Sequence, residues 1–178
     1  MANPNNIIPF IMQAEGGYAN NPADPGGETQ KGITWATWQS VFGNTHDRFI
    51  AMSVADWTAI YTKNYWNPIM GNQITSQRIA DIAVDWAFNS GSGNVVKHIQ
   101  QILVNTFSAA ITVDGGLGPM TLAALNAADE PTLWNAIVAD RIAFYNALVA
   151  NNPSLGVFLK GWLNRVNNLV TFEANGNS

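Results

Sequence analysis

The sequence predicts an all-α protein, because it combines helical apolar spacing, helix-start residues and very few strand patterns. Apolar residues recur at three- and four-residue intervals through most of the 178 residues, as in helices that pack on one face. Serine, threonine, aspartate and proline stand at the starts of these stripes, where they cap or open helices. We expect about eight helices and no sheet, with at most a few extended residues in SAAITVDGG at 108–116.

The first half of the chain is expected to form helices that begin at capping residues and end at glycine. The opening helix carries Ile7, Ile8 and Ile11 and stops at Gly16, because a glycine pair is a typical C-terminal signal. The later caps and their apolar stripes are Thr34 with Trp35, Trp38 and Phe42, Ser53 and Asp56 with Trp57, Ile60, Tyr61 and Tyr65, and Ser76 with Ile79, Ile82, Ala83 and Trp86.

The second half follows a glycine-rich turn, NSGSGN at 89–94, and is again helical throughout. This turn is the expected junction between a lobe at 1–90 and a lobe at 91–178, but it is too short for a linker, so the lobes should pack as one compact unit. The helix starts and stripes here are Ser92 with Val95, Ile99, Ile102 and Leu103, Pro119 with Leu122 and Leu125, Asp129 with Trp134, Ile137, Ile142 and Tyr145, and a last stripe of Leu155, Phe158, Leu159, Trp162, Val166 and Leu169.

Composition favours a neutral polar surface and argues against nucleic acid as a partner. Charged residues make up only 11% of the chain, whereas about 25% is typical. Amide and hydroxyl side chains must therefore supply the polar surface, either as a habit of the source organism or to meet hydroxyl-rich ligands. The net charge is −4 and the eight basic residues are scattered, so no stripe for phosphates is present.

No metal, cofactor or membrane insertion is expected. The chain has no cysteine, and His46 and His98 stand alone, so the usual metal-ligand spacings are missing. No apolar run reaches the ~18 residues of a membrane span. The start, MANPNNIIPF, lacks the pattern of a signal peptide. We expect a monomer made in the bacterial cytoplasm without a signal peptide.

The stretch EGGYANNPADPGGETQKGIT at 15–34 carries the candidate catalytic residues. Glu15 directly precedes a glycine pair, so it should lie at the C-terminal end of a helix, where the helix dipole disfavours a carboxylate. Packing against Phe10 or Tyr18 would also desolvate the carboxyl group. Both effects would raise the pKa of Glu15, as a general acid requires.

Asp24 and Thr29 are the other candidates in this stretch. Two prolines and two glycines near Asp24 allow its loop to turn back toward Glu15, and two carboxylates in different environments are the equipment of glycoside hydrolysis. Thr29 is placed to orient a water molecule or to cap the turn. The alternative is that Asp24 only closes an Asx turn, since DPGG is a common turn sequence.

The same stretch resembles the signature of glycoside hydrolase family 108, N-acetylmuramidases often found in phage and prophage lysis cassettes. The resemblance implies a lysozyme-like helical fold in two lobes with a cleft, and it assigns the catalytic acid to Glu15. The order Glu, Asp, Thr is also similar to the wider phage-lysozyme group, although Thr29 comes slightly earlier than the threonine there. The matching residues are Glu15-Gly16-Gly17-Tyr18, Asn21-Pro22, Asp24, Gly26-Gly27, Thr29 and Gly32-Ile33-Thr34.

The second half resembles the helical peptidoglycan-binding segment that follows the catalytic motif in that family, and the likeness spans most of residues 7–168. It implies hydrolysis of the bond between N-acetylmuramic acid and N-acetylglucosamine in bacterial peptidoglycan. The implied role is that of a phage endolysin, which acts on the cell wall or periplasm after release by a holin-type partner. The likeness is carried by Asp114-Gly115, Gly118-Pro119, Thr121 and Ala124-Leu125.

Candidate sugar contacts lie at loop and helix ends, away from the apolar stripes. Tyr18, Tyr65 and Trp66 offer aromatic faces, and Asn89 offers an amide to an N-acetyl group, with a helix C-cap as its alternative role. Other residues are expected to be structural: Trp57, Trp134 and Trp162 in the core, Asp81 and Asp85 on a solvated face or paired with Arg78, and Arg141 and Arg165 without a bidentate partner.

Two other functions fit the same residues. A non-catalytic wall-binding or secretion-helper protein would keep the fold with an ordinary, ionised Glu15. A lytic transglycosylase would also use one glutamate, but it forms an anhydro sugar and needs no water-activating partner. Assays of reducing ends separate the first from a hydrolase, and mass spectrometry of the products separates the second.

Overall fold

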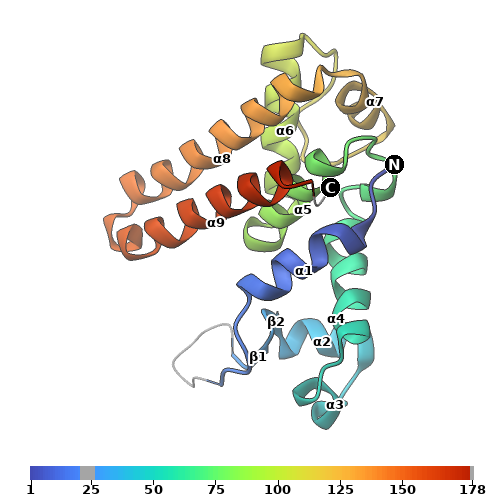
Figure 1. The fold of residues 1–178 in the computed structure, drawn as a ribbon, viewed down its shortest axis with the longest axis vertical. Coiled ribbons are helices and arrows are strands. Elements are labelled where there is room, and N and C mark those ends of the chain that lie inside the picture. The colour runs from blue at the N-terminus through green and yellow to red at the C-terminus, as the bar shows by residue number, and fades with distance from the viewer. Residues whose placement is uncertain (21–26, 177–178) are drawn as a thin grey trace.

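The protein is mainly α-helical, as the sequence predicted, with one small β-hairpin (Figure 1). The computed structural model describes residues 1–20 and 27–176. Within these ranges there are nine α-helices and two strands. They are α1 (Pro4–Ala14), β1 (Thr29–Gln30), β2 (Ile33–Thr34), α2 (Trp35–Phe42), α3 (His46–Ile50), α4 (Val54–Tyr61), α5 (Gln77–Ser90), α6 (Ser92–Phe107), α7 (Pro119–Ala127), α8 (Glu130–Asn151) and α9 (Gly156–Ala174).

The helix starts follow the predicted caps. Ser53 and Asp56 form a complete capping box at α4, and the Thr34 hydroxyl accepts the N–H of Thr37 at 3.1 Å at α2. Asp129 caps α8 in the same way. Only the five-residue helix α3 was not foreseen, because so short a segment shows no apolar period.

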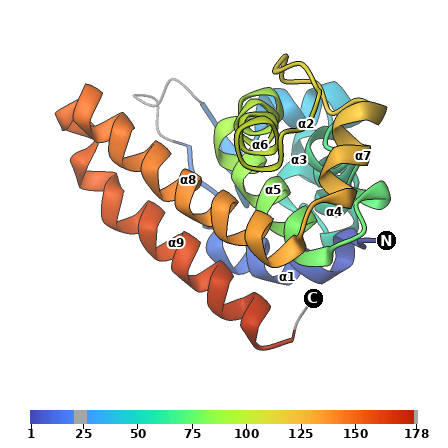
Figure 2. The same ribbon diagram turned by 90° about the horizontal axis from the view of Figure 1, so that it is seen from above.

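The helices are arranged in three groups around α5, which packs against α1, α6 and α8. Figure 1 shows the hairpin and α2–α4 at one end, α6 and α7 at the other, and the α8–α9 pair projecting to one side. Figure 2 shows the same projection from above. Helix α1 packs against both α5 and α9, so the first and last helices are in contact. None of the helices in the described ranges is both long and apolar enough to cross a membrane.

One hydrophobic core joins both halves of the chain. Side chains from 1–90 and from 91–178 are buried together in it. The division into two lobes at this point stays a prediction. Core members include Ile7 and Ile11 of α1, Trp57 and Ile60 of α4, Ile82 and Trp86 of α5, Ile99 and Leu103 of α6, Ile137 of α8 and Leu169 of α9.

The tryptophans expected in the core divide into two kinds. Trp57 and Trp134 are buried, as predicted. Trp162 is only partly buried, and its ring stacks between those of Tyr145 and Phe158, with centroids at 5.2 and 5.8 Å. The last stripe therefore reaches the surface near the free end of the α8–α9 pair.

The β-hairpin is a departure from the all-helical prediction. Lys31 and Gly32 both have positive φ, of 49° and 75°, which is the pattern of a two-residue type I′ turn. Thr29 pairs with Thr34 in the antiparallel register. Strands of two residues are too short to show alternation in a sequence, whereas residues 108–116, where extended structure was considered, form no strand.

The hairpin is fastened to the helices behind it by side-chain hydrogen bonds to main-chain carbonyls. The Lys31 ammonium donates to Met52 O at 2.8 Å, and Gln30 Nε2 donates to Ile50 O at 2.5 Å. In return, Trp57 Nε1 donates to Lys31 O at 3.0 Å. These bonds fix the turn relative to α3 and α4, and hence its position beside the end of α1.

Candidate active site

Glu15 lies where α1 ends, as its glycine neighbours predicted. It is the C-cap residue, with φ −88° and ψ 139°, and its N–H still reaches Ile11 O at 3.1 Å. The side chain is 16% exposed, so the carboxyl group is sheltered but reachable. A partly desolvated carboxyl group at a helix end suits acid–base chemistry.

Gly32 forms one wall around the Glu15 carboxyl group. A Cβ atom added to Gly32 would lie 2.9 Å from Glu15 Cδ and closer still to Oε2. Its φ of +75° also belongs to the left-handed region that favours glycine. Both the turn and the close approach therefore require glycine here, which explains why the hairpin can press against the acid.

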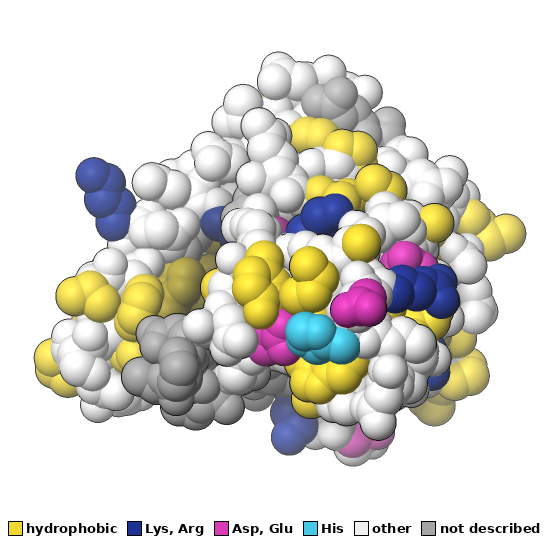
Figure 3. Space-filling view, turned by 90° about the horizontal axis from the view of Figure 1, so that it is seen from below, with side chains coloured by type: hydrophobic (Ala, Val, Ile, Leu, Met, Phe, Trp, Pro, Cys, Tyr) yellow, Lys and Arg dark blue, Asp and Glu magenta, His cyan; other side chains and the backbone are white. Residues whose placement is uncertain are grey.

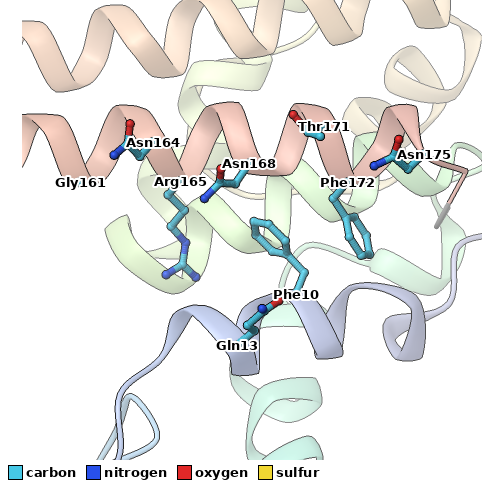
Figure 4. A pocket seen from close by; sticks show the side chains of 9 residues that line it. All are labelled: Phe10, Gln13, Gly161, Asn164, Arg165, Asn168, Thr171, Phe172 and Asn175. Atoms are coloured by element: carbon cyan, nitrogen blue, oxygen red, sulfur yellow. The ribbon is translucent and has the colours of Figure 1, made fainter.

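Arg165 of α9 forms the opposite wall and pairs with two carboxylates. Its Nη1 donates to Glu15 Oε1 at 2.8 Å, while Nε and Nη2 donate to Asp85 Oδ1 at 3.0 and 2.9 Å. Figure 4 shows Arg165 leaving α9 on the side of α1. Burial lowers the pKa of the guanidinium, but the charge of Asp85 and hydrogen bonds to Asp85 and Glu15 outweigh it and raise that pKa above its usual value.

The ion pairs continue inward from Asp85 to Arg141. Asp85 Oδ2 lies 2.8 Å from Arg141 Nη2, and both side chains are completely buried. Glu15, Arg165, Asp85 and Arg141 thus form a chain of alternating charge that we call the ion chain. Each buried charge has an opposite neighbour, and removing one would leave another uncompensated, at a typical cost of about 3–5 kcal/mol.

The structure corrects the expectations for several charged residues. Asp81 and Asp85 are fully buried on α5, not on a solvated face. Arg78 pairs instead with Glu130. Arg165 has two carboxylate partners, since two of its N–H groups converge on the single oxygen Oδ1 of Asp85 and a third reaches Glu15. The apolar residues all around α5 were the signal that its aspartates had to be buried and paired.

Tyr65 is brought to the site, whereas Trp66 is not. Burial and the charge of Glu15 raise the pKa of the half-buried Tyr65, whose ring lies 4.8 Å from that of Phe88. Trp66 has no exposed surface, and its Nε1 donates to Asn72 at 2.8 Å. The prediction that Trp66 contacts sugar is therefore wrong, because the π-helical turn Thr62–Trp66 places its ring in the core.

Tyr18 belongs to a polar cluster on the rim of the hairpin. Its hydroxyl donates to Glu28 Oε1 at 2.7 Å, and the same carboxylate contacts His46 Nε2 at 2.8 Å. The His46 ring meets Trp35 edge-on, with centroids 5.0 Å apart. Hydrogen bonds from Tyr18 and then His46 lower the pKa of Glu28. Tyr18 is 47% exposed and stays a candidate sugar contact.

Glu28 and His46 were missed by sequence reasoning, because nothing in the spacing links residues eighteen positions apart. Figure 3 shows the lower face of the molecule, with acidic, histidine and hydrophobic side chains next to one another. No group of three or more acidic, histidine or cysteine side chains within residues 1–20 and 27–176 is arranged to hold a metal ion.

Asn89 lies exposed at the end of α5. One of its N–H groups donates to Asp85 O at 2.8 Å, within the same helix. This is close to the alternative role, in which the amide serves the helix end. A contact with an N-acetyl group stays a prediction.

Asp24 lies outside the residues that the structure describes, so its approach to Glu15 stays a prediction. Thr29 starts the hairpin, and its main-chain N–H and C=O exchange hydrogen bonds with Ala19 at 2.8 and 2.9 Å. This bridge brings Thr29 to the segment that follows Glu15. Its proposed role in orienting water also stays a prediction.

Comparisons with known proteins divide the chain in two. Residues 8–91 match the family described as glycosyl hydrolase 108, and residues 94–167 match a predicted peptidoglycan domain. The solved structure described as that of Brucella abortus SagA is similar over 96% of this chain and 94% of that one, with 29% identity and a TM-score of 0.77. No curated protein matches the chain.

Proposed function

We propose that the chain is a glycoside hydrolase directed at peptidoglycan, and more specifically an N-acetylmuramidase, because residues 8–91 match the glycosyl hydrolase 108 family and residues 94–167 match a predicted peptidoglycan domain. The bond to be cleaved joins N-acetylmuramic acid to N-acetylglucosamine. The observation that carries this proposal is Glu15, held at the end of α1 between Gly32 and Arg165 with a partly exposed carboxyl group.

Glu15 is proposed to donate a proton to the departing glycosidic oxygen. Because Arg165 donates to Oε1, the proton would reside on Oε2. General acid catalysis of this kind typically contributes about 10² to 10⁴ in rate. As the positive charge of the sugar develops, the Glu15 carboxylate left behind regains its ion pair with Arg165, so the same arginine orients the acid and stabilises its conjugate base.

Asp24 is proposed as the second carboxyl group, with Thr29 orienting the water. A separation from Glu15 of about 6.5–9.5 Å predicts inversion, because it leaves room for that water, whereas about 5–5.5 Å predicts a covalent retaining path. Optical rotation or NMR of the first-formed product distinguishes the two anomers. Asp24→Asn should slow cleavage on either path, and a variant with full activity would exclude a direct role.

We further propose the role of a phage-type endolysin, acting on the cell wall after release by a holin-type partner. Support comes from the likeness of residues 15–34 to lysis enzymes. Co-expression with and without a holin in a bacterial host tests this role, since lysis should require both proteins. Lysis by the chain alone would exclude dependence on release.

Products from purified sacculi decide the reaction. A muramidase releases fragments with N-acetylmuramic acid at the reducing end, which reducing-end assays detect and mass spectrometry identifies. Fragments that end in an anhydro sugar would show a transglycosylase. N-acetylglucosamine at the reducing end would show cleavage of the other glycosidic bond and refute the muramidase assignment.

A non-catalytic wall-binding protein is the second candidate, favoured by one observation. Arg165 Nη1 donates to Glu15 Oε1 at 2.8 Å, so the carboxyl group also serves as a structural ion-pair partner between α1 and α9. Such a protein would bind sacculi without producing reducing ends. Parallel pull-down and reducing-end assays on the same sacculi separate binding without cleavage from hydrolysis.

A further inference from the structure

A groove of about 680 Å³ lies between α1 and α9, beside the Glu15–Arg165 pair. Figure 4 shows α9 above it and α1 below it, with Arg165 between Asn164 and Asn168 along α9. Along α9 the lining runs from Gly161 to Asn175, a separation of fourteen residues or roughly 21 Å of helix. The groove is therefore longer than a single sugar ring, and it includes Arg165, the ion-pair partner of the candidate acid.

Amide side chains dominate the walls of this groove. Asn164, Asn168 and Asn175 project from α9, and Gln13 faces them from α1 (Figure 4). The asparagines are four and seven residues apart, which places them on one face of the helix. All of these side chains are exposed, so the groove presents both donors and acceptors to solvent.

The floor is aromatic and the lining carries a single charge. The rings of Phe10 and Phe172 lie 5.3 Å apart in the lining of the groove. Arg165 is the one charged residue among those that line the groove, and its N–H groups already serve Glu15 and Asp85. A carboxylate-rich ligand, such as a stem peptide, finds no unpaired cation here.

These features fit a neutral ligand that carries hydroxyl and amide groups and an apolar ring face. We propose that the α1–α9 groove binds N-acetylated sugar units of the glycan strand on one side of the bond that Glu15 cleaves. The proposal rests on the proposed function for the identity of the strand. It adds a binding surface made jointly by the first and last helices, outside the rim that carries Tyr18.

Gly161 provides a way to close the groove without damaging the helix. It lines the groove on α9, a Cβ atom there would meet nothing within 4 Å, and its φ is not in the left-handed region. Gly161→Phe should therefore fill the groove, while the matched control Gly161→Ala leaves it open. A second test variant is Asn168→Leu, with Asn167→Leu as its control. Both asparagines are exposed on α9, but they lie on different faces of the helix, and of the two only Asn168 lines the groove.

Binding is measured in the Glu15→Gln background, so that the probe is not consumed. A tetramer of N-acetylglucosamine is titrated while NMR follows the side-chain amide signals of Gln13, Asn164, Asn168 and Asn175. We expect these signals to shift, and we expect Gly161→Phe to weaken binding at least tenfold while Gly161→Ala does not.

Several results would overturn the proposal. They are unchanged amide signals, equal affinity of the Phe and Ala variants at Gly161, and shifts that appear only with a soluble stem peptide. Failure of the proposed function looks different, because it is measured on sacculi with the parent protein. Hydrolysis without groove shifts removes the groove and keeps the enzyme, whereas groove shifts without hydrolysis remove the muramidase and keep a sugar-binding groove.

Discussion

Replacing Arg165 by methionine tests the ion chain directly. The side chain is 15% exposed and holds Glu15 and Asp85 together, so its loss leaves two carboxylates facing a gap in the interior. Removing one partner of a buried ion pair typically costs about 3–5 kcal/mol. Because Asp85 keeps Arg141 and Glu15 can reach solvent, we expect the lower end, about 3 kcal/mol.

The measurement is unfolding by heat and by denaturant. For a chain of this size, about 3 kcal/mol corresponds to a fall in Tm of roughly 6–12 °C. The matched control is Arg78→Met, which breaks a partly exposed ion pair with Glu130 and should cost no more than about 1 kcal/mol. Arg165→Lys should fall between the two, since lysine keeps the charge but lacks the planar fork that serves two carboxylates.

An equal loss of stability in the two methionine variants would refute the reasoning. It would mean that the pairs around Asp85 contribute no more than a surface contact. A second refuting result is full stability of Arg165→Met together with full hydrolysis of sacculi, because the arginine would then neither hold the interior nor orient Glu15.

Three further predictions concern the acid, the wall beside it and the response to pH. Glu15→Gln should lower the hydrolysis of sacculi by about 10² to 10⁴ with the fold intact by circular dichroism, and more than a tenth of the parent rate would exclude Glu15 as the acid. Gly32→Ala should lower both activity and Tm. Its control is Gly43→Ala, which should lower Tm alone, because Gly43 also has a positive φ but has open space around it. Equal activities of the two variants would show that the close contact between Gly32 and Glu15 is unimportant. Burial, followed by the charge of Glu173, raises the pKa of Asp81 to about 8. The folded state therefore holds a proton that the unfolded state releases, and stability should fall as pH rises from about 4 to about 8. Asp81→Asn should flatten this decline in Tm, and an unchanged dependence of Tm on pH would contradict the assignment.

Local rules were enough to predict most of the helices and the position of Glu15. Caps and glycine stops act within a few residues, so Ser53, Asp129 and Gly16 marked real helix ends. The hairpin at residues 29–34 was missed because two-residue strands carry no alternating pattern. Its stability comes from contacts with α3 and α4 that only the folded chain provides.

The electrostatic part of the site was beyond sequence spacing. Arg165 meets Glu15 across 150 positions and Asp85 across 80 positions, and no local pattern links residues so far apart. The apolar surroundings of Asp85 on α5 were the one available signal of burial. The exposure of Trp66 was predicted wrongly for a different reason. Residues 62–66 form a π-helical turn, so their side chains do not follow the α-helical spacing on which the prediction was based.

The ion chain also constrains how this protein can be inherited and recombined. Glu15 and Asp85 come from the segment that matches the hydrolase family, whereas Arg141 and Arg165 come from the peptidoglycan segment. The hydrolase segment thus supplies the two acids of the ion chain, and the peptidoglycan segment supplies the two arginines that neutralise them. A recombination event at residues 92–93 would leave Asp85 buried and unpaired and Glu15 without its arginine, unless the new partner brought arginines to the same places. We therefore expect a chimera between relatives to fold only when both halves of this charge pattern are transferred together.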